Sequence, residues 1–489
     1  MSDFIKKGNL TKPLKLMKEH PSREDNEELN ELLRKYENLK RGRSQSYLDE
    51  EAFEKIIDHF DDREDLKRAL DAAERAVDQF PFSSSLLIRK ADLMIASRKY
   101  KEALKILDHA ATLDSNDINL YILRTDIYLA LEKHEKAVEI LEEALLLFNG
   151  QEKVELLFEL ADVYDDYEEF EKVFDCLKLI LEEDPNNEEA LYKICFWTDF
   201  TGRNEESITL HKKIIDDFPY NELAWFNIAA AYQGVKLYEK ALDAYQYAIV
   251  IDEKFDYAYR NMADAYIRLR KYREAIDALE KVIELSKPES LIYEAIGHCY
   301  DKLYNNAQAR IYYRKATHIN PEESKLFYKI ACTYFNEGKW ESAARQLETS
   351  LRIHPKQVEY NLLMGECKMQ MGFYKDAIHY FSAVVSSKPR NSKGWEALIR
   401  SLYITENYEE AEDQVIAALK FTNNKPIFIY YQSLILFALG KSKEALLLLQ
   451  KALEAAPKTL KKFVDLNPSV LQNQQVVDIV AKFKKNKFR

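Results

Sequence analysis

The sequence predicts an all-α fold, an α-solenoid of about twelve 34-residue helix hairpins with a helical cap at each end. Three observations predict it. Prolines recur with a constant period, for example at Pro321, Pro355 and Pro389. One column of the resulting frame holds alanine in ten of twelve repeats. Within each repeat, apolar residues follow the i, i+3, i+4, i+7 spacing of an amphipathic helix.

Composition narrows the class of protein. The 489 residues include 71 Lys and Arg against 83 Asp and Glu, a net charge of −12, and only 11 Gly and 12 Pro. A hydrophobic fraction of 47% is enough to bury a core, so neither a collagen-like nor a wholly disordered chain is expected. The acidic balance disfavours general nucleic-acid binding.

Other segments exclude a secreted or membrane protein. The N-terminal residues lack an apolar signal segment, and the longest apolar run, residues 426–440, is too short to span a bilayer. The five cysteines are scattered without a C-x-x-C pair, which is typical of reduced thiols. We therefore expect a cytoplasmic protein with no membrane contact.

A frame with proline at position 32 divides most of the chain into twelve repeats. The period is constant except for one step that is longer by two, which an insertion near Asn149 and Gly150 explains. The frame predicts an N-terminal amphipathic helix and linker over 1–49, a solenoid over 50–457, and a C-terminal capping helix with a basic tail over 458–489. The predicted repeats begin at Glu50, Ser84, Ile118, Val154, Glu188, Glu222, Asp256, Ser290, Ser324, Val358, Ser392 and Pro426.

Each column has a physical reason. Positions 4, 7, 8 and 11 form the apolar stripe of a first helix, and positions 20, 24 and 27 form that of a second. Alanine at position 20 lets two helix backbones approach closely. Proline at position 32 cannot continue a helix. Glycine at position 15 can take the left-handed conformation that ends one, as expected at Gly202, Gly338, Gly372 and Gly440.

These columns resemble those of the tetratricopeptide repeat (TPR) family, which has the same period. The match is closest in the sixth repeat, with Trp225, Tyr232 and Ala241, and in the eighth, with Tyr300 and Pro321. The chain's flanks and its Tyr/Lys/Glu-rich style are similar to long cytoplasmic TPR proteins of Bacteroidota bacteria. The resemblance implies a right-handed superhelix that binds proteins. Its concave face would be lined by positions 2, 5, 6, 9, 12 and 13 of each first helix.

The two ends differ from the repeats. Residues 1–49 carry a net charge of +2 and predict an amphipathic helix over 23–40, opened by Ser22, with an exposed linker over 40–46. This helix either caps the first repeat or serves as an arm for a partner or for dimerisation. Residues 458–489 carry a net charge of +6 and predict a terminal helix after Pro468, followed by a solvated basic tail.

No catalytic constellation is present in the sequence. It contains no glycine-rich phosphate loop, no H-E-x-x-H and no G-x-S-x-G. His298, with Cys332 one repeat along, is the one imaginable metal site, and an ordinary groove histidine beside a thiol is the favoured interpretation. We therefore expect no enzyme activity, no cofactor and no metal.

The predicted concave face is graded in chemistry. Its first and fourth repeats are strongly acidic, whereas its middle mixes aromatic side chains with Asn, Arg and Lys, which suits capture of an extended peptide. The alternative is that the middle aromatics pack between neighbouring repeats. The acidic positions are Glu51, Glu54, Asp58, Asp61 and Asp62, then Glu155, Glu159, Asp162, Asp165 and Asp166. The candidate binding residues are Tyr192, Phe196, Phe200, Phe226, Asn227, Tyr257, Arg260, Asn261, Lys325, Tyr328 and Lys329.

A carboxylate clamp of the kind that TPR domains use on chaperone C-termini is not expected. The five positions hold Arg260, Asp264, Ala295, Lys325 and Lys329, so the basic pair is present and both Asn are lost. The twelfth repeat instead places an apolar set on the predicted concave face. Either the C-terminal helix covers this set, or the set is a site for self-association or for a partner. The set is Ile427, Tyr430, Tyr431, Leu434 and Phe437.

The sequence thus predicts a non-enzymatic scaffold that binds a protein or extended peptide in its groove. Its acidic walls would steer basic partners and exclude acidic ones. One alternative is a self-assembling structural subunit, such as a homodimer formed through the termini or the twelfth repeat. Another is a regulatory subunit of an enzyme complex.

Overall fold

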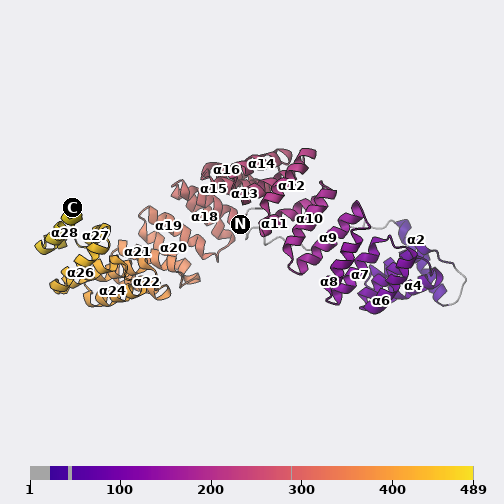
Figure 1. The fold of residues 1–489 in the computed structure, drawn as a ribbon, viewed down its shortest axis with the longest axis horizontal. Helices are drawn as coiled ribbons and strands as arrows, with labels where there is room; N and C mark the ends of the chain where they lie inside the picture. The colour runs from indigo at the N-terminus through magenta and orange to yellow at the C-terminus, as the bar shows by residue number, and fades with distance from the viewer. Residues whose placement is uncertain (1–22, 42–46, 288, 488–489) are drawn as a thin grey trace. The chain divides into compact units, whose positions relative to one another are not determined.

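The chain is all-α throughout the residues that its structure, a computed structural model, describes: 23–41, 47–287 and 289–487 (Figure 1). Ser22, most of the predicted linker and the last two residues of the basic tail lie outside this range. The chain divides into two compact units, Met1–Ala258 and Tyr259–Arg489, with the boundary inside helix α15.

The first unit contains an N-terminal helix, α2 (Arg23–Lys40), followed by six helix hairpins. Within each hairpin the first and second helices pack on one another, and each hairpin packs on the next. The pairs are α3 (Glu50–Asp61) with α4 (Leu66–Gln79), α5 (Ser84–Ala96) with α6 (Tyr100–Leu113), α7 (Ile118–Ala130) with α8 (His134–Ala144), α9 (Gln151–Asp166) with α10 (Phe170–Glu183), α11 (Glu188–Thr201) with α12 (Asn204–Asp217), and α13 (Glu222–Gly234) with α14 (Tyr238–Ile251).

The second unit continues the series with six more hairpins, the first of them opened by α15. The pairs are α15 (Asp256–Arg268) with α16 (Tyr272–Leu285), α17 (Ser290–Lys302) with α18 (Asn306–Ile319), α19 (Ser324–Asn336) with α20 (Trp340–Ile353), α21 (Val358–Gln370) with α22 (Tyr374–Ser387), α23 (Ser392–Ile404) with α24 (Tyr408–Phe421), and α25 (Pro426–Ala438) with α26 (Ser442–Ala455). After them come η1 (Pro457–Thr459), α27 (Leu460–Leu466), η2 (Pro468–Gln472) and α28 (Gln474–Lys487).

The paired helices confirm the predicted fold class. Eleven of the twelve first helices begin at the residue that the repeat frame gives, and the fourth begins at Gln151 instead of Val154. The preceding helix, α8, is short, and Gly150 takes a positive φ of 62° before α9 starts. The extra length of this step is therefore absorbed in the turn and in a longer α9. The division of the chain at residues 49 and 457 remains a prediction.

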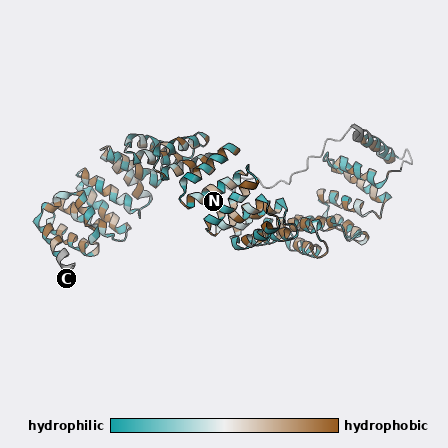
Figure 2. Cartoon of the chain, turned by 90° about the horizontal axis from the view of Figure 1, so that it is seen from above, coloured by the Kyte–Doolittle hydropathy of each residue, from teal (hydrophilic) through white to brown (hydrophobic). Residues whose placement is uncertain are grey.

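The alanine column lies at the centre of the helix contacts. All ten alanines at position 20, from Ala69 in the first repeat to Ala445 in the last, have no exposed surface. A methyl side chain at this point lets the second helix approach the first, and the larger apolar residues around it fill the space that remains. Figure 2 shows hydrophobic and hydrophilic residues interspersed along the helices.

The turn at position 15 is left-handed in all twelve repeats. The four predicted glycines have φ between 72° and 80°, and in the other eight repeats a non-glycine residue, such as Glu64 or Tyr304, also has a positive φ near 60°. In eleven repeats the next N–H then donates to the carbonyl five residues back, as Lys99 does to Met94 at 2.8 Å. This backbone bond closes the end of each first helix.

The proline column has a second role that the sequence did not predict. The carbonyl of Pro219 accepts the indole N–H of Trp225 at 2.8 Å, and the carbonyl of Pro389 accepts that of Trp395 at 2.7 Å. Both tryptophans are at position 4 of the following repeat. The proline therefore ends one hairpin, and its carbonyl orients the first helix of the next.

Helix α2 packs on the first hairpin. Tyr36 is 1% exposed, and its hydroxyl donates to Asp71 of α4 at 2.7 Å, where the ammonium of Lys40 also binds at 2.7 Å. On the other side, Lys55 of α3 pairs with Glu28 at 3.1 Å. These contacts favour the capping interpretation of the N-terminal helix.

Additional helices cover the twelfth repeat at the other end. Helix α27 begins one full repeat period after Pro426 and so takes the place of a thirteenth first helix. Its Phe463 is fully buried against the ring of Tyr430, with 5.7 Å between centroids, and Val470 and Val476 extend the same core. Among the described residues, no helix is both long and apolar enough to cross a membrane.

We expect Gly365→Ala to destabilise the protein by about 1–3 kcal/mol, because an added Cβ would lie 2.4 Å from the buried ring of Phe381. Gly234→Ala is the matched control. There the Cβ would meet only the side-chain amide of Asn204, which can rotate away, and alanine is the better helix former by about 1 kcal/mol. Urea denaturation of both variants measures the difference, and equal midpoints would contradict the packing argument.

Candidate functional site

Four carboxylates on three consecutive first helices form one surface of the first unit. We call Asp92 of α5, Asp126 of α7, and Glu159 and Asp162 of α9 the acidic row. Helix α7 packs against both α5 and α9, so these side chains come from neighbouring repeats. Partial burial raises the pKa of each of them. Repulsion adds to this effect along the row, since Asp92 raises the pKa of Asp126, which in turn raises that of Glu159.

Among the described residues, cations form ion pairs only with the two ends of the acidic row, although Lys193 also attracts Glu159. Arg89 binds Asp92 at 2.6 Å, and it also binds Asp58 and Asp61 at 2.9 and 2.8 Å. At the other end Lys193 lies 3.9 Å from Asp162 and closer, at 2.8 Å, to Glu189. In the described part of the chain, Asp126 and Glu159 have no ion pair. The middle of the row therefore keeps its negative potential.

The aromatic residues of the fifth repeat cluster beyond the acidic row. Phe196 and Phe200 lie against Trp197, at 4.9 and 5.7 Å between centroids, and Phe200 also contacts Phe170 of α10 at 4.9 Å. The predicted alternative, packing between neighbouring repeats, therefore applies to part of this set. Phe200 still exposes 54% of its surface, and Tyr192 exposes 51%. The Tyr192 side chain shares a hydrogen bond with Tyr257, which is 52% exposed.

Asn227 does not belong to an accessible site, although the sequence analysis placed it there. It is 2% exposed, and its amide N–H groups donate to the carbonyl of Leu191 at 2.7 Å and to Nε2 of His211 at 3.2 Å. Nδ1 of His211 lies 2.8 Å from the carbonyl of Ser207, so Nδ1 carries the proton and Nε2 accepts. Phe226 also packs inward, 5.7 Å from Tyr245 and 5.0 Å from Phe255.

The other predicted binding residues lie in the second unit, where ion pairs within the chain engage the cations. Arg260 binds Glu289 at 3.0 Å and Ser286 at 3.2 Å, and Asn261 is half-buried. Tyr328 lies on Tyr360, with 5.0 Å between ring centroids.

Glu294 supplies a carboxylate to the basic pair of the ninth repeat. Its Oε1 lies 2.7 Å from Lys329 and 3.4 Å from Lys325. Burial alone would raise the pKa of Glu294, but its bonds to the two lysines outweigh burial and lower it. The chain therefore provides its own carboxylate at the place where a clamp would bind one from a ligand. The signal for this pairing in the sequence is the glutamate at position 5 of the preceding repeat, Glu294.

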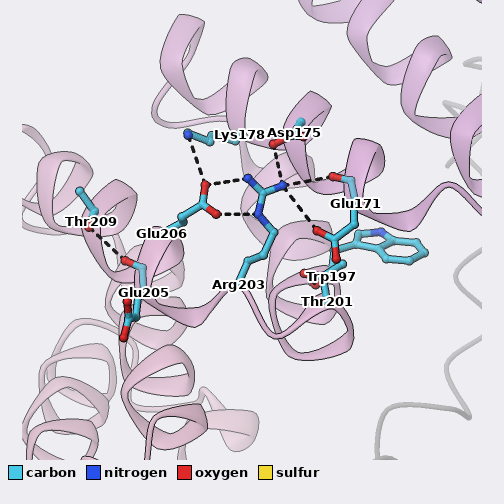
Figure 3. A network of polar contacts seen from close by, with 9 residues as sticks. All are labelled: Glu171, Asp175, Lys178, Trp197, Thr201, Arg203, Glu205, Glu206 and Thr209. Carbon is cyan, nitrogen blue, oxygen red and sulfur yellow. Dashed lines mark hydrogen bonds and ion pairs between the residues drawn. The ribbon is translucent and has the colours of Figure 1, made fainter.

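Arg203 joins the fourth and fifth repeats (Figure 3). It forms a bidentate pair with Glu206 at 2.8 and 2.6 Å, binds Asp175 of α10 at 2.6 Å, and lies over the ring of Phe174. The fifth repeat lacks the consensus alanine at position 20, where Ser207 stands. The arginine network compensates with side-chain bonds at this turn, so we assign it a structural role.

The apolar set of the twelfth repeat is covered. Ile427, Tyr430, Tyr431 and Leu434 are each at most 7% exposed, and Tyr430 and Leu434 share a core with Phe463 of α27. Of the two interpretations that the sequence left open, the structure favours coverage by the C-terminal helices. Only Phe437, the fifth residue of the set, is half-buried.

His298 was the one imaginable metal ligand in the sequence. Nowhere in the described ranges do three or more His, Cys, Asp or Glu side chains gather as a metal site would require. His298 is half-buried, and burial together with Lys329 and Lys302 lowers its pKa.

The sequence contains a signal for the acidic row in one column of the repeats. Position 9 holds aspartate in each of the first four repeats, at Asp58, Asp92, Asp126 and Asp162. The first and fourth repeats were predicted to be acidic, and Asp92 and Asp126 of the two repeats between them were not included. The structure therefore extends two separate acidic patches into one continuous row.

The fold and this surface define a helical-repeat protein. Tetratricopeptide repeat profiles match residues 55–118, 118–149, 256–288, 291–323 and 362–426. The chain is a tetratricopeptide repeat protein. That is a family of repeat scaffolds which generally bind proteins and are usually non-enzymatic.

Solved structures of other repeat proteins are similar to this chain at low identity. YrrB, described as a TPR protein with an unusual peptide-binding site, is 20% identical and covers 38% of this chain and 96% of its own, with a TM-score of 0.35. MamA is 17% identical and covers 35% and 94%, with a TM-score of 0.33. The Cut9–Hcn1 hetero-tetramer of APC/C is 14% identical and covers 82% and 96%, with a TM-score of 0.34. No curated protein matches the sequence.

We expect acid to weaken the fold through His211. Burial lowers its pKa to about 4, below the value of about 6.5 in an unfolded chain, so the folded state holds the neutral form. Stability is therefore lost as the pH falls from about 6.5 to 4, by roughly 3 kcal/mol when complete.

The carboxylates of the acidic row act in the opposite direction, because their raised pKa values favour the fold on protonation. A comparison with His211→Gln isolates the histidine, since only that contribution differs. Denaturation of both proteins across this pH range measures it. Parallel stability curves for the two proteins would contradict the assignment.

Proposed function

We propose that this chain is a non-enzymatic scaffold that binds a partner protein through an extended basic segment, on the first helices of its first unit. The observation that carries the proposal is the centre of the acidic row, where Asp126 and Glu159 form no ion pair in the described part of the chain and repulsion between carboxylates outweighs the attraction of Lys193 for Glu159. Keeping like charges this close costs the fold free energy, which a Lys- or Arg-rich ligand would recover.

Recognition would combine charge with apolar contact. The acidic row attracts and orients the basic residues of a ligand, and the exposed faces of Tyr192, Phe200 and Tyr257 offer rings beside it. Lys193 already lies over the ring of Phe158 at 5.0 Å, which is the contact that a ligand lysine would make with such rings. Because the helices are rigid, binding would cost little ordering of the scaffold.

The predicted residues of the second unit have a lesser place in this proposal. Arg260, Lys325 and Lys329 are engaged by Glu289 and Glu294, so an acidic ligand would have to displace a carboxylate of the chain. Asn261 and Tyr328 remain candidates for secondary contacts. We also propose a cytoplasmic location, consistent with five free cysteines.

We expect the double variant Asp126→Asn, Glu159→Gln to bind a basic peptide about tenfold more weakly than the wild type, because two carboxylates no longer attract it. The probe is a fluorescent lysine-rich peptide followed by anisotropy at low and high salt. Glu139→Gln with Glu143→Gln on α8 is the control, with the same change in net charge on a second helix. Equal affinity in all three proteins would overturn the assignment to the acidic row.

The natural partner is identified by affinity purification from the source cells, followed by mass spectrometry. A protein with a basic segment that is recovered with the wild type and the control, and lost with the acidic-row variant, supports the scaffold. A co-purified enzyme would specify a regulatory subunit. Recovery of the same proteins by all three chains would place the binding surface elsewhere.

A further inference from the structure

The two units of the chain carry opposite net charge. Residues 1–258 contain 35 Lys and Arg against 57 Asp and Glu, a net charge of −22. Residues 259–489 contain 36 against 26, a net charge of +10. The overall value of −12 conceals this asymmetry. A protein with two oppositely charged units has, in a second copy of itself, a partner of complementary charge.

The positive charge of the second unit includes a cluster at its C-terminal hairpins. We call Arg400, Lys425, Lys458 and Lys462 the basic end. All four side chains are exposed. The three lysines line an open cavity beside the start of α25, where Glu396 is the one carboxylate of the lining. Glu396 pairs with Lys462 at 2.8 Å, and Lys425 donates to the hydroxyl of Ser392, so the cluster keeps an excess of positive charge.

The acidic row and the basic end each extend over three successive helices of the stack. The row lies on three first helices, α5, α7 and α9. The basic end lies on α23, at the start of α25, and around the start of α27, which occupies a thirteenth first-helix position. In both sets each helix packs directly on the next, about 10 Å away. The two surfaces are therefore similar in extent and opposite in charge.

We propose that the acidic row of one copy binds the basic end of a second copy, so that the chain self-associates head to tail. This rests on the proposed function, because it names the basic partner of the same acidic row. Charge complementarity selects the second copy as occupant. The apolar set of the twelfth repeat is less suited to self-association, because four of its five residues are buried.

The test is analytical ultracentrifugation of the full chain with a charge-swap series. Wild type is expected above the monomer mass of 57.4 kDa at low salt and at that mass at high salt. Asp126→Lys with Glu159→Lys, and separately Lys425→Glu with Lys458→Glu, should each remain monomeric. An equimolar mixture of these two variants should associate again, because the reversed row of one faces the reversed end of the other.

Controls separate local from general charge effects. Glu139→Lys with Glu143→Lys on α8 has the same net charge as the reversed row and should still associate, and circular dichroism checks that every variant is folded. A monomeric wild type at low salt, or a mixture that fails to associate, would overturn the proposal. If the wild type is monomeric but the acidic-row variant has lost the basic peptide, the proposed function stands and this inference alone fails.

Discussion

A left-handed residue at position 15 determines the geometry of every repeat. It ends the first helix and turns the chain so that the second helix runs back along it. In eight of the twelve repeats a non-glycine residue holds this conformation, at a cost of about 1 kcal/mol each. The cost is borne because the following residue's N–H closes the helix end, and because the second helix then places its position-20 side chain against the first. Because the helices on both sides of the turn are packed against each other, they hold the turn in this conformation.

The same regularity arranges the surface. Because each first helix repeats the orientation of the one before, residues at a given position form rows along the stack. A row of alanine at position 20 makes a uniform core, and a row of aspartate at position 9 makes a line of like charges. At about 10 Å between neighbours, this spacing is comparable to the screening length of physiological salt. Burial raises the pKa values of Asp126 and Glu159, and repulsion from neighbouring carboxylates raises them further.

The position of each residue within its repeat could be predicted from the sequence, whereas the contacts that its side chain makes with other repeats could not. The frame located the turns at Gly202 and Gly338 and the buried alanines, because these depend on the local chain and on one fixed neighbour. Asn227 occupies a groove position by its number, but its amide reaches back to Leu191 in the preceding repeat and is buried. Lys329 was predicted to contact a peptide or protein ligand, and Glu294 of the preceding repeat binds it within the chain. In each case a side chain contacts the preceding repeat. The column pattern gives the position of the residue in its repeat, but it does not give this contact.

The charge of the acidic row is not needed for folding. Position 9 also holds Phe196, Ala230, His298 and Cys332 in other repeats of the same geometry, so the fold places no demand on this side chain. Aspartate in four successive repeats costs repulsion that neutral residues would avoid, and the cations in reach, Arg89 and Lys193, offset it only at the ends. A feature that weakens the fold without shaping it is best explained by what it binds. This cost without a structural return is the reason why we propose the acidic row as the binding surface of the scaffold.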